Sequence, residues 1–230
     1  MVVARQDPRR QVAFADRCDA AAVLARSLER FRGASTVTLG IPRGGVVVAA
    51  EVARQLGTPL DVIVTRKLGA PFSAELAIGA VTANGGRFLD EEIIRQLGVS
   101  EAYLKAVTDV QRAEAARQER QFRGNRPPPA VEGATVIVVD DGLATGATMR
   151  AAVRSLRQRH PARIVVAAPV GSVQACDALR AEADEVVCPY ELPDFGAVGW
   201  YYVNFEQTSD DEVQELLEGP PAGAARRAGG

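Results

Sequence analysis

The chain is poor in the residues that build metal sites and disulfide frameworks. Its 230 residues include one histidine and three cysteines, Cys18, Cys176 and Cys188, which lie far apart and form no CxxC pair. A sparse and odd cysteine count is typical of reduced thiols in a cytoplasmic protein. With one histidine and no cysteine cluster, a transition-metal site is not expected.

Long apolar runs and a large net charge are also missing. No run approaches the roughly 20 residues that cross a bilayer, and no apolar signal core follows the N-terminus. The formal net charge is −2 and the sequence pI is about 5.6, so binding of nucleic acid through bulk charge is not expected. The hydrophobic content of 47% is typical of a globular protein. We expect one soluble cytoplasmic domain over residues 1–218, followed by a disordered tail at 219–230.

Apolar β-branched runs alternate with helical patterns along most of the chain. This order indicates an α/β domain with a parallel sheet of about five strands flanked by helices on both faces. The expected strands are 36–41, 60–65, 78–81, 135–139, 163–170 and 185–188. The expected helices are 16–32, 45–56, 146–159 and 173–181.

Two stretches interrupt this alternation. Residues 88–126 show no strand pattern and contain a long charged helix from about 100 to 122, so we expect a helical excursion from the core. The narrow apolar stripe of this helix consists of Tyr103, Val107, Val110 and Ala113. Residues 189–211 are rich in aromatic side chains and lack clean periodicity, which indicates a small C-terminal hood.

One segment joins a strand pattern to a helix pattern through two acids and a loop of small residues. Residues 136–148 read Val-Ile-Val-Val-Asp-Asp-Gly-Leu-Ala-Thr-Gly-Ala-Thr. Asp140 and Asp141 are expected at the carboxyl end of the strand, because charges inside the sheet would be costly and ligands of open parallel sheets bind beyond that end. The following loop offers backbone N–H groups and the hydroxyls of Thr145 and Thr148 at a helix N-terminus, which favours a phosphate. Since carboxylates suit ribose hydroxyls, the segment fits a ribose 5-phosphate. The alternative is an N-capped helix after a solvated strand end, which would explain neither the double acid nor the loop.

This pattern resembles the motif with which type I phosphoribosyltransferases bind 5-phosphoribosyl 1-pyrophosphate (PRPP), and the match covers all thirteen positions. The resemblance implies the parallel α/β fold of that family and a reaction in which an acceptor nitrogen attacks C1 of PRPP as pyrophosphate leaves. It implies that Asp140 and Asp141 are catalytic and that Mg²⁺ arrives bound to PRPP. The PRPP contacts implied in this segment are Asp140, Asp141, Gly142, Leu143, Ala144, Thr145, Gly146, Ala147 and Thr148.

A second anion site is expected after the first strand. There Arg43, Gly44 and Gly45 precede a helix pattern, and an arginine beside a helix N-terminus suits pyrophosphate. In the family this loop holds the pyrophosphate and often contains a cis non-proline peptide bond, which would lie at Arg43–Gly44. An ordinary strand-to-helix turn would account for the glycines but not for the arginine.

The second strand is expected to end in Arg66 and Lys67. The family places at this point a flexible basic loop that closes over PRPP, excludes water and neutralises the departing charge. The resemblance therefore assigns Arg66 and Lys67 to catalysis. The alternative is a solvated basic strand end followed by a turn.

The acceptor side has a weaker signature. Family members that act on 6-oxopurines carry a third acid where this chain has Ala144, so hypoxanthine and guanine are disfavoured as acceptors. A hood covers the acceptor in this family, and Phe195, Trp200 and Tyr201 are the leading candidates to stack on it, with Tyr202 and Phe205 as further ones. The alternative is that these aromatic side chains fill a small core of their own.

The sequence thus predicts a transferase whose partners are the small molecules PRPP, with Mg²⁺, and an unidentified acceptor. Two alternatives stay open: a regulatory PRPP- or nucleotide-binding protein without transfer activity, and an enzyme that breaks nucleotides down by hydrolysis or pyrophosphorolysis at the same site. Nucleic acid and membranes are not expected partners, and a homodimer is left open.

Overall fold

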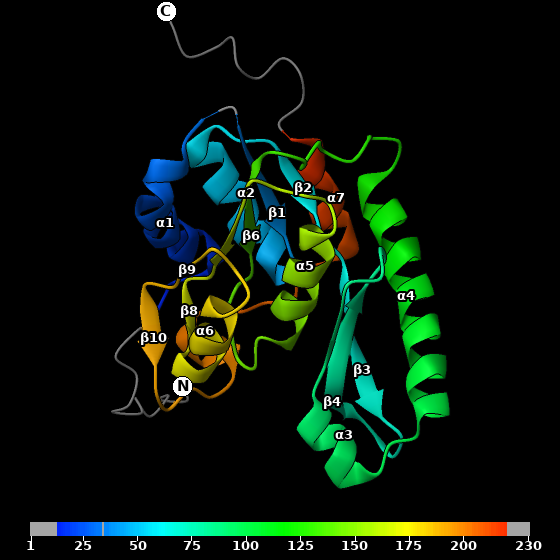
Figure 1. The fold of residues 1–230 in the computed structure, drawn as a ribbon. Coiled ribbons are helices and arrows are strands. Elements are labelled where there is room, and N and C mark those ends of the chain that lie inside the picture. Colours follow the sequence, from blue (N-terminus) through cyan, green and yellow to red (C-terminus); the bar gives the residue numbers. More distant parts are fainter. Residues whose placement is uncertain (1–12, 34, 220–230) are drawn as a thin grey trace, which may run out of the picture.

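A five-stranded parallel sheet forms the centre of the molecule (Figure 1). The computed structural model describes residues 13–33 and 35–219. The strands lie in the order β2-β1-β6-β7-β9 and all neighbours pair in parallel. Their bounds are β1 Thr36–Gly40, β2 Leu60–Val62, β6 Thr135–Val139, β7 Arg163–Ala167 and β9 Glu185–Val187. The predicted α/β fold is confirmed, and five of the six expected strands supply this sheet.

Helices cover both faces of the sheet, because alternate strand residues point to opposite sides and both sides are apolar. On one face, α1 Arg17–Leu28 and α2 Gly44–Leu56 pack on strand residues such as Ile137 and Val165. A short helix η1, Glu29–Phe31, continues α1. On the other face, α5 Ala147–Arg157 and α6 Val173–Arg180 pack on Val136, Val138 and Ile164. Full burial of each such side chain contributes about 1.5–3 kcal/mol.

An arm of antiparallel strands and helices projects from the core, as Figure 1 shows. It consists of β3 Thr65–Ala70, β4 Ser73–Thr82, β5 Arg87–Leu89, α3 Glu91–Leu97 and α4 Glu101–Arg123. The strand expected at residues 78–81 is confirmed as part of β4, but it pairs within the arm and not in the central sheet. Ile78 and Val81 pack under α3 and α4, so their apolar pattern reflects burial within the arm.

The arm differs from the helical excursion predicted for residues 88–126 in its bounds and in its strand content. Its chain leaves the core at Thr65 rather than at residue 88, and β5 lies in a stretch that showed no strand pattern. The long helix is confirmed, and Tyr103 and Val107 do face the arm sheet. Val110 is 63% exposed and Ala113 is also exposed, because the second half of α4 turns other residues toward the core.

The end of α4 returns to the core beside α7 Asp210–Glu218. Ala115 and Phe122 pack there with Val62 of β2 and Val213 of α7. Arg123 closes this contact, since its guanidinium lies 2.9 Å from Asp61 and 2.8 Å from Glu119. The core end of the arm is thus fixed by buried apolar contacts and by a largely buried ion pair.

The C-terminal hood is built from two distant parts of the chain. β8 Val170–Ser172 pairs with β10 Tyr190–Leu192, and a short helix η2, Val198–Tyr201, follows. The expected strand 163–170 thus divides between β7 and β8. Residues 13–16 join the hood, because the N–H of Phe14 donates to the Tyr201 carbonyl at 2.9 Å and that of Val203 donates to the Phe14 carbonyl at 2.8 Å.

The predicted tail lies outside the described residues from position 220 onward. Within the described parts of the chain, every helix is too short or too polar to cross a bilayer.

Candidate functional site

A cavity of about 1160 Å³ opens where the carboxyl ends of the core strands meet the arm and the hood. Its walls come from the β1–α2 turn, the β6–α5 loop, the β3–β4 hairpin, one face of α4 and residues 205–208. This is the edge at which open parallel sheets bind ligands. Most of the residues singled out in the sequence line it: Arg43, Gly44, Arg66, Lys67, Asp140, Asp141, Gly142, Leu143, Ala144, Thr145, Gly146 and Thr148.

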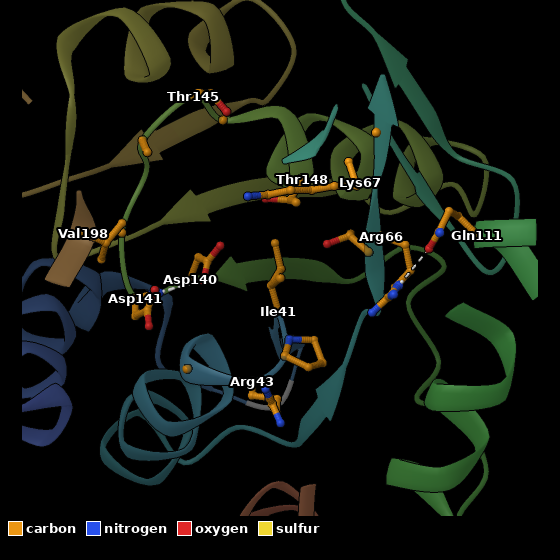
Figure 2. A pocket seen from close by; sticks show the side chains of 18 of the residues that line it. Ile41, Arg43, Arg66, Lys67, Gln111, Asp140, Asp141, Thr145, Thr148 and Val198 are labelled. Carbon is orange, nitrogen blue, oxygen red and sulfur yellow. Dashed lines mark hydrogen bonds between the residues drawn. The ribbon is translucent and has the colours of Figure 1, made fainter. Parts of the chain in front are cut away.

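Asp140 and Asp141 line the cavity directly after the buried strand β6 (Figure 2). The N–H of Asp140 donates to the Ala167 carbonyl at 3.1 Å, and the N–H of Asp141 donates to Oδ1 of Asp140 at 2.9 Å. Burial and the neighbouring Asp141 carboxylate raise the pKa of Asp140 well above its ordinary value. Burial also raises the pKa of Asp141, against the opposing charge of Arg17. Two such carboxylates gain free energy from hydroxyl donors supplied by a ligand.

The loop after the two acids is fixed by hydrogen bonds to the hood, and three of its backbone N–H groups are left free by the described residues. The N–H of Leu143 donates to the Val170 carbonyl at 3.0 Å, and the Ser172 hydroxyl donates to the Ala144 carbonyl at 2.7 Å. Gly146, with φ +74°, makes the left-handed turn from which α5 starts at Ala147. Among the described residues, the N–H groups of positions 144, 145 and 146 have no hydrogen-bond acceptor. Free N–H groups at a helix N-terminus form an anion site.

The β1–α2 turn brings a second helix N-terminus to the same cavity. Arg43 is the N-cap residue of α2, and its guanidinium lies 3.7 Å from the Asp210 carboxylate. Gly44 lines the cavity, and Gly45 packs against Asp140. The cis peptide bond expected at Arg43–Gly44 lies one position earlier, between Pro42 and Arg43, and α2 begins at Gly44.

Arg66 and Lys67 lie on strand β3 and not on a loop, which corrects the prediction from the sequence. The strand extends because it pairs with β4, where Arg66 is opposite Val81 and Lys67 is opposite Ala80. Figure 2 shows Lys67 reaching into the cavity from the side opposite the two acids. Arg66 turns toward α4, where its Nε donates to Oε1 of Gln111 at 3.1 Å.

The hood aromatic residues are divided between a small core and the cavity. Phe195 and Tyr201 stack with their ring centroids 4.8 Å apart, and Tyr201 is buried. Trp200 is 58% exposed. None of these three is among the described residues that line the cavity, whereas Phe205 is. The sequence could not separate them, because aromatic residues in an irregular segment carry no periodicity that marks a face.

Several cavity residues were not predicted from the sequence. Arg17, at the start of α1, donates from Nε to Oδ2 of Asp141 at 2.9 Å. Tyr202, one of the further stacking candidates, does not line the cavity but lies directly behind it: its hydroxyl donates to the Asp141 carbonyl at 2.6 Å, and burial raises the pKa of Tyr202, which keeps the phenol protonated. Gln111 and Val198 line the cavity from α4 and the hood. Nothing in the sequence marked Arg17 as a site residue, since a basic residue in a helical pattern is usually solvated.

The carboxylates do not form a metal cage by themselves. In the part of the chain that the structure describes, no three His, Cys, Asp or Glu side chains converge in a way that could hold a metal ion. The donor set suits a divalent cation that arrives on a pyrophosphate, because Mg²⁺ then needs few protein oxygens.

Comparisons with known proteins agree with this geometry. The phosphoribosyl transferase domain model matches residues 13–204. Two curated Mycobacterium tuberculosis proteins, named "Putative phosphoribosyl transferase Rv0571c" and "Putative phosphoribosyl transferase MT0597", are each 44% identical over 205 residues, which is 89% of this chain and 46% of theirs. The chain therefore spans about half the length of the curated relatives it matches.

The crystal structure of the protein TT1426 from Thermus thermophilus superposes with a TM-score of 0.75 at 43% identity, covering 89% of this chain and 97% of that one. With the domain match over most of its length and the predicted motif at the cavity, the chain belongs to the type I phosphoribosyltransferase family.

Proposed function

We propose that the protein transfers the 5-phosphoribosyl group of PRPP, bound with Mg²⁺, to a nitrogenous acceptor and releases pyrophosphate. The acceptor nitrogen forms the new bond to C1 as the bond from C1 to the pyrophosphate oxygen breaks. The observation that carries the proposal is the convergence of paired carboxylates, an open N–H loop and Lys67 on one cavity.

Each group has a defined task in this reaction. Asp140 and Asp141 accept hydrogen bonds from the ribose 2′- and 3′-hydroxyls, and the loop at Ala144–Gly146 binds the 5′-phosphate through its free N–H groups. Lys67 faces these groups across the cavity, where its charge can stabilise the departing pyrophosphate. Arg43 stands at the α2 N-terminus and supplies a second positive charge for the same group.

The cavity also supports a restriction on the acceptor. Ala144 is exposed at the loop, and its methyl group cannot exchange a proton with a purine N7. We therefore propose that the acceptor is not a 6-oxopurine. Among the described aromatic side chains of the hood, Phe205 is the one that lines the cavity and that a planar acceptor would meet, since Phe195, Trp200 and Tyr201 lie elsewhere in the hood.

Calorimetry with PRPP and Mg²⁺ tests the proposal. We expect Mg²⁺-dependent binding by the wild type and severe weakening in the double variant Asp140→Asn/Asp141→Asn, because each lost charge-assisted hydrogen bond costs about 1.5–3 kcal/mol. Asp177→Asn is the matched control, since this exposed carboxylate pairs with Arg180 on α6 and does not line the cavity. Equal PRPP affinity in the wild type and the double variant would refute the ribose assignment.

A turnover assay then separates transfer from the alternatives. Incubation with PRPP, Mg²⁺ and a mixture of amines and nitrogen heterocycles should release pyrophosphate together with a phosphoribosylated product, detected by mass spectrometry. Tight PRPP binding without any product would favour a regulatory binding protein. Loss of the base from added nucleotides without PRPP formation would favour hydrolysis.

A further inference from the structure

Arg17 joins three parts of the site through one guanidinium group. Its Nε donates to Oδ2 of Asp141 at 2.9 Å, and its Nη1 donates to the Glu206 carbonyl at 2.8 Å. The guanidinium carbon lies 4.0 Å from the centre of the Phe205 ring. The side chain is 12% exposed, so these contacts are made largely out of water, where each is stronger than at a surface.

The backbone that carries Arg17 is fixed independently of its side chain. Asp16 caps α1 by accepting a hydrogen bond from the N–H of Asp19 at 2.9 Å. The N–H of Asn204 donates to the Ala15 carbonyl at 2.9 Å, which ties the residue before this cap to the hood. Arg17 therefore projects from a rigid corner between α1 and the hood.

The N-terminus of α2 closes around the same ion pair. A Cβ atom added at Gly44 would overlap Oδ2 of Asp141 and lie 2.7 Å from Nε of Arg17. Oδ1 of Asp141 makes no hydrogen bond to any described residue. The contacts of Oδ2 thus hold the carboxylate in one orientation, while the other oxygen stays available to a ligand.

The electrostatic surroundings give Arg17 a second effect on Asp141. The groups that face the two acids are Arg17 from α1, Lys67 from β3 and the Tyr202 hydroxyl from the hood. Arg43 and Glu206 line the same cavity. Burial raises the pKa of Asp141, and the charge and hydrogen bond of Arg17 are the main opposing influences. Without Arg17, the carboxylate would take up a proton at a higher pH.

We propose that Arg17 is a positioning residue that holds Asp141 in its ribose-binding orientation and fixes the Phe205–Glu206 segment at the cavity rim. The inference rests on the proposed binding of PRPP. Its consequence is that the hood and the ribose site are coupled, because one side chain anchors both. A pre-positioned carboxylate also saves the entropy cost of ordering it when the ligand binds.

Three variants test the role of Arg17. Arg17→Gln removes the charge, Arg17→Lys keeps the charge but loses the planar fork, and Arg26→Gln removes an exposed charge from the same helix away from the cavity. Calorimetry with Mg²⁺ and PRPP should be run from pH 5.5 to 8.5, and thermal melting should be followed over the same range. Melting first establishes that each variant is folded at the temperature of the titrations.

We expect Arg17→Gln to weaken PRPP binding about tenfold or more, since a charged hydrogen-bond partner is lost. Its affinity should begin to fall at a higher pH than in the wild type, because Asp141 is protonated earlier. Arg17→Lys should restore the pH profile with an affinity between the two, and Arg26→Gln should match the wild type. The melting temperature of Arg17→Gln should lie furthest below that of the wild type at high pH and approach it as Asp141 is protonated.

The inference and the proposed function fail in different ways. Wild-type protein that does not bind PRPP would refute the proposed function, and the pH-dependent melting difference would still test the Arg17–Asp141 coupling. An Arg17→Gln variant with wild-type affinity and pH profile would overturn the inference. A loss of affinity that is uniform across pH, or one that Arg17→Lys does not relieve, would also overturn it, since both outcomes indicate a packing role only.

Discussion

The pair of acids at the end of β6 should stabilise ligand binding and destabilise the ligand-free protein. Burial and the adjacent Asp141 carboxylate raise the pKa of Asp140, so the folded protein binds a proton at this residue more tightly than the unfolded chain does. The ionised Asp140 carboxylate therefore lowers the free energy of unfolding, and this cost is largest at a pH above the raised pKa. It shrinks as the pH falls through that pKa and vanishes near the ordinary value of about 3.9.

Asp140→Asn removes the charge and keeps the shape. The amide oxygen can still accept the hydrogen bond that the Asp141 N–H donates to Oδ1 at 2.9 Å. We therefore expect a higher melting temperature than in the wild type at pH 8, where each kcal/mol gained corresponds to about 2–4 °C for a domain of this size. The same change should weaken PRPP binding by about 1.5–3 kcal/mol, or roughly ten- to 150-fold.

The assay is thermal melting between pH 4 and pH 8 combined with calorimetry at pH 8. The difference in melting temperature between variant and wild type should shrink as the pH falls, and Asp177→Asn should show no comparable gain. A lower melting temperature of Asp140→Asn at pH 8 would refute the reasoning, as would a gain that does not change with pH.

Three further predictions concern the leaving group and the acceptor. Lys67→Ala should reduce the affinity for PRPP and pyrophosphate about tenfold and spare ribose 5-phosphate. Arg66→Ala should have the smaller effect, because Arg66 is hydrogen-bonded to Gln111. Titration of the three ligands tests this, and equal weakening of all three would show that Lys67 is structural. Wild-type protein should not transfer phosphoribose to hypoxanthine or guanine, and product analysis that finds rapid guanosine monophosphate formation would contradict the role given to Ala144. Phe205→Ala should change the relative rates with different acceptors, and Trp200→Ala should leave them unchanged because Trp200 does not line the cavity; acceptor competition assays would contradict this if the two variants behaved alike.

The sequence alone determined the central sheet and the PRPP-type segment, because both depend on neighbours in the chain. A buried strand, two acids, a small-residue loop and a helix start follow one another over residues 136–148, so their relative positions are fixed by local backbone geometry. The structure places these residues at the carboxyl edge of the sheet as expected. The sequence also predicted the anion-binding turn at Arg43, because its strand end, its glycines and its helix start are neighbours in the chain as well.

Tertiary structure alone decided what surrounds this segment. The sequence predicted a strand at residues 78–81 but could not show that it pairs within the arm, because an apolar run does not specify which sheet it joins. Lys67 stands opposite the acids because β3 pairs with β4, and Phe205 reaches the cavity because the hood folds back over it. Arg17 and Asp141 are 124 residues apart in the chain, and no periodicity or motif links them. Their contact exists because α1, α2 and the hood all pack around the end of β6, and the position of a side chain in such a junction follows from the packing of whole elements.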